Sequence, residues 1–182
     1  GKTGIAVRRI DGDWVVGQRG GELFPQQSVS KLWVTMAVLE KVDRGELSLD
    51  TPITITRDDL TLFHQPLATR VAREGTVRET VRTLIDEALT ASDNSANDAL
   101  LRTAGGPGVV NEFLRRKGLS SIRFGPGERL LQSGIAGVEW RQELSAGRAF
   151  QAARDRVPLD RRRNLLSAYV ADPIDGASPE GI

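Results

Sequence analysis

Two short polar motifs contain residue types that nucleophilic catalysis needs. Ser28-Val29-Ser30-Lys31 has the form S-x-x-K and lies where apolar residues begin to recur at helical spacing. Side chains three residues apart on a helix share one face, so the Lys31 amine can reach the Ser28 hydroxyl. A serine hydroxyl needs an adjacent base to become a good nucleophile, and a neutral lysine amine can be that base. At a helix start, the backbone N–H of Ser28 is also able to stabilise an oxyanion.

Ser92-Asp93-Asn94 is the second motif, 64 positions after Ser28 (92 − 28). Ser92 can pass a proton to a leaving nitrogen, and Asn94 can hold a substrate amide. Each motif also has a structural interpretation. S-x-x-K can be a helix cap followed by a solvated lysine, and S-D-N can be a polar turn in which Asn94 or Ser95 caps the next helix. Chance predicts about 0.2 matches to the first motif and about 0.02 to the second, so the two together are the specific signal.

Composition limits the function classes. A chain of 182 residues fits one domain, and 25 basic against 24 acidic side chains give no reason to expect nucleic-acid binding. The absence of cysteine excludes a thiolate nucleophile, a disulfide and a cysteine-based zinc site, and His64 is the one histidine, too few for a zinc hydrolase. No apolar run approaches the roughly 20 residues of a membrane span.

The periodicity predicts an opening hairpin followed by helices. Residues 4–10 and 14–18 are expected to be strands, joined at the Asp11-Gly12 turn signal. Helices are predicted over about 28–44, 77–90, 96–103, 109–117, 138–156 and 160–170. The Thr76 and Glu79 pair has the spacing of a capping box for the second of these helices. A lone hairpin makes a poor sheet, so we expect further strands to be missing from this sequence or supplied by something else.

The motifs resemble the penicillin-recognising serine enzymes, especially class A β-lactamases. That family also separates its two serines by about sixty residues. The resemblance implies an α/β fold in which a helical domain packs beside an antiparallel sheet flanked by helices. Residues 1–27 would be the N-terminal hairpin of the α/β domain, and residues 28–182 a mainly helical domain. The C-terminal strands of the α/β domain, with the family's K-[TS]-G motif, are expected to be missing. Lys2-Thr3-Gly4 spells that motif only by coincidence.

The resemblance also assigns a catalytic carboxylate. In class A enzymes a glutamate in an omega-shaped loop lies 36 positions past the S-D-N serine, which is Glu128 here (92 + 36). The family pattern E-x-x-L-N matches Glu128 and Leu131 but has Gln132 in place of asparagine. Such a glutamate can take a proton from a water that then attacks the acyl-enzyme. The structural alternative is a surface carboxylate in a loop.

The omega loop is expected to be enlarged. Asp175 in Asp172-Pro173-Ile174-Asp175 resembles the family's ion-pair partner in this loop, but Pro126 replaces the usual arginine, so Asp175 is expected to pair with Arg123 or Arg129. It follows Glu128 by 47 positions (175 − 128) against about 13 in the family. We therefore expect a helical insertion at roughly 133–171 within a loop of about 123–178. Arg161-Arg162-Arg163 inside it is interpreted as a solvated helix face, with a partner site as the alternative.

The resemblance predicts a serine β-lactamase that forms a Ser28 acyl-enzyme and hydrolyses it with water activated by Glu128. Either Lys31 or Glu128 can be the base for acylation. The site residues are Ser28, Lys31, Ser92 and Glu128 for catalysis, and Asn94, Gln132 and either or both of Phe63 and His64 for substrate binding. The expected partner is a β-lactam, without metal, cofactor, nucleic acid or membrane span, in the periplasm or secreted. The oligomeric state is left open, with a monomer favoured. The alternatives are a D-alanyl-D-alanine peptidase and a non-catalytic binding domain.

Overall fold

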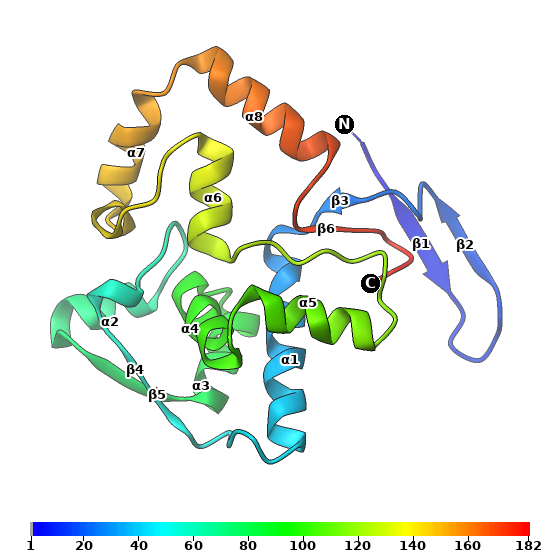
Figure 1. The fold of residues 1–182 in the computed structure, drawn as a ribbon, viewed down its shortest axis with the longest axis horizontal. Helices are drawn as coiled ribbons and strands as arrows, with labels where there is room; N and C mark the ends of the chain where they lie inside the picture. The colour runs from blue at the N-terminus through cyan, green and yellow to red at the C-terminus, as the bar shows by residue number, and fades with distance from the viewer. Residues whose placement is uncertain (1) are drawn as a thin grey trace.

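A computed structural model describes residues 2–182 (Figure 1). The helices are α1 (Lys31–Asp43), α2 (Leu67–Glu74), α3 (Val81–Thr90), α4 (Asn94–Ala104), α5 (Pro107–Arg116), α6 (Glu128–Ala136), α7 (Gly147–Asp155) and α8 (Leu159–Ala171), with short 3₁₀ turns η1 (Gln27–Ser30), η2 (Arg57–Asp59) and η3 (Gln142–Ser145). The strands are β1 (Ile5–Arg8), β2 (Val15–Gln18), β3 (Phe24–Pro25), β4 (Pro52–Ile55), β5 (Val77–Thr80) and β6 (Gly176–Ala177). The predicted hairpin and the first helix are present, and the architecture is mixed α/β as expected.

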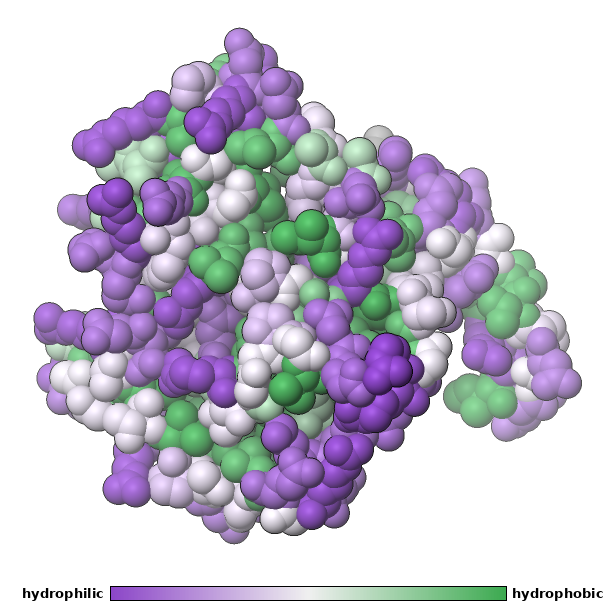
Figure 2. All heavy atoms as spheres, in the orientation of Figure 1, coloured by the Kyte–Doolittle hydropathy of each residue, from purple (hydrophilic) through white to green (hydrophobic). Residues whose placement is uncertain are grey.

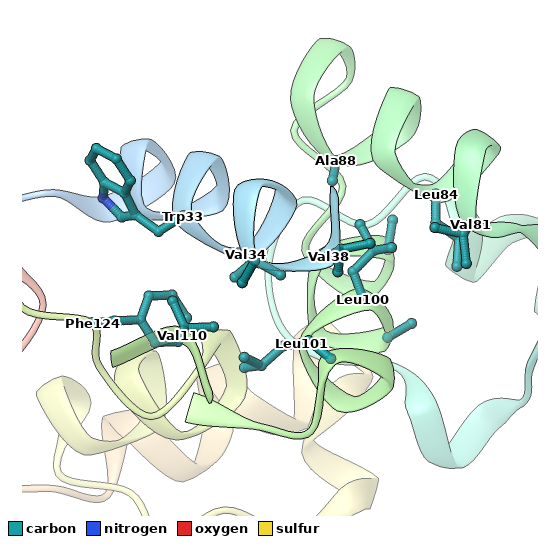
Figure 3. Close-up of a cluster of buried hydrophobic side chains, with 14 of the residues drawn as sticks. Trp33, Val34, Val38, Val81, Leu84, Ala88, Leu100, Leu101, Val110 and Phe124 are labelled. Atoms are coloured by element: carbon teal, nitrogen blue, oxygen red, sulfur yellow. The ribbon is translucent and has the colours of Figure 1, made fainter. Parts of the chain in front are cut away.

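Helix α1 lies at the centre of the hydrophobic core. Its buried face, which includes Trp33, Val34 and Val38, packs with side chains of α3, α4 and α5, as Figure 3 shows. Leu100 of α4 and Leu84 of α3 are completely buried in the same cluster. Burying one such side chain contributes about 1.5–3 kcal/mol, so the core fixes α1 rigidly, together with the turn that precedes it.

The predicted capping box at Thr76 and Glu79 is wrong. Residues 77–80 form β5, which pairs antiparallel with β4, and α3 begins only at Val81. The cap of α3 is Thr80, whose hydroxyl accepts a hydrogen bond from the Thr83 backbone N–H (3.2 Å). Strand pairing prevails because it buries Val77 against the core, and a helix starting at that residue would give up the ladder to β4.

The expectation that no strands follow the hairpin is also wrong. Residues 2–182 contain three two-stranded sheets, β1–β2, β3–β6 and β4–β5. Pairing of β3 with β6 puts Phe24 opposite Ala177, and Ile122 forms a further bridge to Ala177. The last residues of the chain therefore return to the segment just before Ser28.

The opening hairpin extends from the side of the molecule (Figure 1). Strand β1 pairs antiparallel with β2, from Ile5 opposite Gln18 to Arg8 opposite Val15. Many of its apolar side chains are exposed, and the protrusion on the right of Figure 2 shows hydrophobic spheres among hydrophilic ones. Val7 and Val16, which face each other in the ladder, are 55% and 63% exposed.

Residues 124–175 form a long excursion that closes on itself. The Arg123 backbone N–H donates to the Gly176 carbonyl (2.8 Å), and the excursion between them contains α6, η3, α7 and α8. The helical character predicted for residues 133–171 is thus confirmed, but a single helix over 138–156 is wrong. Gly137, with φ of +72°, ends α6, and η3 interrupts the chain before α7.

Candidate active site

Ser28 and Lys31 are positioned by the start of α1. Ser28 lies in η1, and Lys31 is the first residue of the α-helix, so the spacing of three brings their side chains together. The Lys31 Nζ atom donates to the Ser28 Oγ atom over 3.0 Å. Lys31 is 1% exposed, whereas Ser28 is exposed, so the serine is open to solvent and the lysine is not. A solvated lysine after a helix cap is therefore excluded.

Glu128 lies on the other side of the same amine. Its Oε1 atom accepts a hydrogen bond from Lys31 Nζ over 3.0 Å, and Glu128 is 5% exposed. Glu128 is the first residue of α6 rather than a loop residue, and the positive end of the helix dipole stabilises a carboxylate there. One buried amine thus contacts both the hydroxyl of Ser28 and the carboxylate of Glu128.

Lys31→Met tests how strongly this buried pair is coupled. The substitution leaves the Glu128 carboxylate buried without its cation, so the free energy of unfolding is expected to fall by about 3–5 kcal/mol. For a domain of this size, that is a drop of about 6–20 °C in the thermal midpoint, measurable by calorimetry.

The Lys31→Met/Glu128→Gln double variant is the control for that experiment. It removes both charges, and replacing a whole buried pair by neutral groups is often neutral for stability. We therefore expect it to recover most of the midpoint. Equal destabilisation of the single and double variants would show that Lys31 contributes packing alone.

Asp98 anchors the backbone that carries Glu128, and the sequence analysis missed it. The Asp98 carboxylate accepts hydrogen bonds from the backbone N–H groups of Glu128 (2.9 Å) and Arg129 (3.3 Å), and it pairs with the Arg129 side chain. Burial raises the pKa of Asp98 against the opposing effect of these donors. Gly127 allows the close approach, because a Cβ atom there would lie 2.8 Å from Leu101 and 3.2 Å from Asp98. A lone aspartate inside a helix gives no sequence signal for this contact.

Ser92 faces Ser28 from the turn before α4. Its Oγ atom donates to the Ser28 Oγ atom over 3.2 Å, and its φ of +55° is left-handed. Such a conformation costs a non-glycine residue about 1–3 kcal/mol. Asp93 holds the turn, because its carboxylate accepts from the backbone N–H groups of Ala96 (2.9 Å) and Leu67 (2.7 Å).

The residues expected to bind substrate differ in their exposure and in the groups that they contact. Asn94 is buried, and its side-chain amide donates to the Leu62 carbonyl (2.9 Å), so it supports the neighbouring loop. In that loop the exposed Phe63 packs edge-on against Phe150 (5.4 Å between ring centroids), and His64 Nε2 contacts the Ala91 carbonyl (2.8 Å). Gln132 contacts residue 27 instead, as its Nε2 atom donates to the Gln27 Oε1 atom (2.9 Å).

The predicted ion pair of Asp175 is wrong. Arg123 pairs with Asp172 and Arg129 with Asp98. Asp175 accepts instead from the Tyr169 hydroxyl (2.8 Å) and from the Gln27 backbone N–H (3.1 Å). Because Asp175 is 1% exposed, it needs donors close at hand, and neutral donors meet that need at this position.

Within residues 2–182, no group of three His, Cys, Asp or Glu side chains is arranged to hold a metal ion. No helix in the same range is both long and apolar enough to cross a membrane.

A family model described as "Beta-lactamase enzyme family" matches residues 1–168. The chain belongs to this family. The fold is that of class A β-lactamases. The last common ancestor of Gram-negative bacteria class A β-lactamase superposes with a TM-score of 0.67 at 28% identity, covering 98% of this chain and 53% of that one. A class A representative from Bacteroides cellulosilyticus gives 0.65 at 27% identity, covering 91% and 60%.

A β-lactamase from Chitinophaga pinensis shares the fold at 22% identity, with a TM-score of 0.66 over 98% of this chain and 53% of that chain. This β-lactamase family member therefore spans about half the length of the solved relatives it matches.

Proposed function

We propose that the whole protein hydrolyses β-lactams through an acyl-enzyme on Ser28. The observation that carries the proposal is the position of Lys31 Nζ, 3.0 Å from both the Ser28 hydroxyl and the Glu128 carboxylate. This arrangement supports serine chemistry, because an exposed hydroxyl touches a buried amine that can accept or relay its proton. Family membership and the class A fold support the substrate class.

In the acylation step the Ser28 oxygen attacks the carbonyl carbon of the β-lactam ring. Its proton passes to Lys31 or, through Lys31, to Glu128, and the negative charge develops on the carbonyl oxygen. The backbone N–H of Ser28 is one donor to that oxygen. When the ring C–N bond breaks, Ser92, whose hydroxyl lies 3.2 Å from Ser28 Oγ, donates its proton to the nitrogen and receives in its place the proton that left Ser28.

In the deacylation step Glu128 takes a proton from a water, and the water oxygen attacks the ester carbonyl. The bond to the Ser28 oxygen then breaks, and that oxygen receives the proton, which restores both the Ser28 hydroxyl and the Glu128 carboxylate. Retention of Glu128 beside Lys31 favours hydrolysis over a peptidase that stops at a stable acyl-enzyme. It also distinguishes the site from a binding module, which has no use for an activated hydroxyl. Export to the periplasm or out of the cell belongs to the same proposal, since β-lactams act there.

The direct test is to measure turnover of benzylpenicillin by the full-length protein. Turnover is monitored as the loss of the β-lactam absorbance. We expect many turnovers per protein molecule. A single stoichiometric acylation without turnover would assign the peptidase alternative. Absence of both acylation and turnover would assign the non-catalytic one.

A further inference from the structure

The residue before the proposed nucleophile has a strained backbone. Gln27 has a φ of +50°, in the left-handed region that non-glycine residues rarely adopt. As the first residue of η1, it sets the direction of the chain at Ser28, and thus where the Ser28 hydroxyl points. Contacts from outside the helix must hold such a residue in place, because its own preference is against it.

Two residues of the long excursion supply those contacts. The Gln27 backbone N–H donates to Asp175 Oδ2 (3.1 Å), and the Gln27 side-chain amide donates to the Tyr169 hydroxyl (2.7 Å). The Tyr169 hydroxyl in turn donates to Asp175 Oδ1 (2.8 Å), which closes a ring of three hydrogen bonds among Gln27, Tyr169 and Asp175. Gln132 adds a fourth contact, donating to Gln27 Oε1 (2.9 Å).

The ring is built to keep its donors and acceptors fixed. Asp175 is buried, and Tyr169 is half-buried. Burial, together with the hydrogen bond to Asp175, raises the pKa of Tyr169 above its ordinary value, so the phenol stays protonated and remains a donor.

Tyr169 also connects helix α8 to the turn that contains Ser28. None of the side chains of α8 is fully buried, and the C-terminal end of the helix lies beside β3, just before Gln27 (Figure 1). The Tyr169 hydroxyl is therefore the point at which this exposed helix reaches the nucleophile's turn.

We propose that Tyr169 is a positioning residue for Ser28: with Asp175 it holds Gln27 in the left-handed conformation that directs the Ser28 hydroxyl toward Lys31. The proposal rests on the function proposed above. It gives one residue of α8, a helix that the class resemblance does not explain, an indirect role in acylation.

Tyr169→Phe in the full-length protein removes the hydroxyl and keeps the ring. We expect the rate of acylation by a fluorescent penicillin to fall about tenfold, because a small misplacement of a nucleophile is costly. Deacylation, which depends on Glu128, should stay within about twofold. Leu166→Ala, at an exposed position on the same helix, is the matched control and should leave both rates unchanged.

Rescue separates positioning from simple support of the fold. Glycine adopts positive φ without strain, so Gln27→Gly should make Tyr169 dispensable. We expect Tyr169→Phe/Gln27→Gly to acylate within about threefold of Gln27→Gly alone. A tenfold loss that persists in the double variant, or an unchanged rate in Tyr169→Phe, would overturn the proposal.

A crystal structure of Tyr169→Phe tests the inference independently of activity. Gln27 should leave the left-handed region, and an unchanged φ would refute the holding role. If the wild-type protein is not acylated at all, the proposed function fails, and this structural readout still decides whether Tyr169 holds Gln27.

Discussion

Replacing Ser28 by alanine is expected to lower benzylpenicillin hydrolysis by about 10⁴-fold or more, the loss typical when a catalytic serine is removed. The reason is that Ser28 supplies the oxygen of the acyl-enzyme. Without that hydroxyl, the Lys31 amine has no nucleophile in contact with it to activate. Hydrolysis is measured by initial rates at saturating substrate in the full-length protein.

Ser167→Ala is the matched control for that experiment, because Ser167 is an exposed serine on α8 and should keep the wild-type rate. Because Ser28 is exposed, Ser28→Ala should leave the fold intact. The thermal midpoint of this variant should therefore stay near that of the wild type. Residual hydrolysis within tenfold of the wild type would remove Ser28 from the mechanism.

Glu128→Gln is expected to stop the reaction at the acyl-enzyme. Glutamine keeps an oxygen that can accept a hydrogen bond from Lys31 but is not basic enough to take a proton from water. Removing a general base typically costs about 10²–10⁴ in rate, so deacylation should slow by that factor. Rapid-mixing absorbance should show one burst of substrate consumption per protein molecule and then a slow steady state.

The rate of that burst also identifies the base for acylation. If Lys31 is the base, the burst rate in Glu128→Gln stays near the wild type, and if Glu128 is the base, the burst itself slows. Glu139→Gln, at an exposed position in the same excursion, should behave as the wild type. Full turnover in Glu128→Gln would contradict the assignment of Glu128 to deacylation.

The local part of the site was predictable from the sequence. Ser28 and Lys31 meet because helical geometry brings positions three apart onto one face, which needs no knowledge of the tertiary fold. Placing Glu128 beside them depended on the family's spacing, because a contact across 97 positions has no local signal. Glu128 was nevertheless expected in a loop, whereas it is the first residue of helix α6.

The supporting residues could not be predicted in the same way. Asp98 holds Glu128, and Tyr169 holds Asp175, through contacts between elements that only the folded chain brings together. An arginine partner was expected for Asp175 because the family pairs the corresponding aspartate with an arginine of the omega loop. A phenol and a backbone N–H serve instead, and one tyrosine in an exposed helix does not indicate such a role.

Competition between two local signals explains the error at residues 76–80. Thr76 with Glu79 and Thr80 with Thr83 both offer a hydroxyl three residues before a backbone N–H. Pairing of β5 with β4 decides between them, and the sequence analysis had not predicted β4. Helix α3 was predicted because its apolar residues recur clearly at helical spacing. Its starting residue was not predicted correctly.

Peptide mapping by mass spectrometry after brief exposure to benzylpenicillin tests the central claim most directly. We predict an adduct with the mass of the intact penicillin on the peptide containing Ser28, which decays with time in the wild-type protein and persists in Glu128→Gln. An adduct on any other residue, or one that decays equally fast in both proteins, would contradict the proposed roles of Ser28 and Glu128.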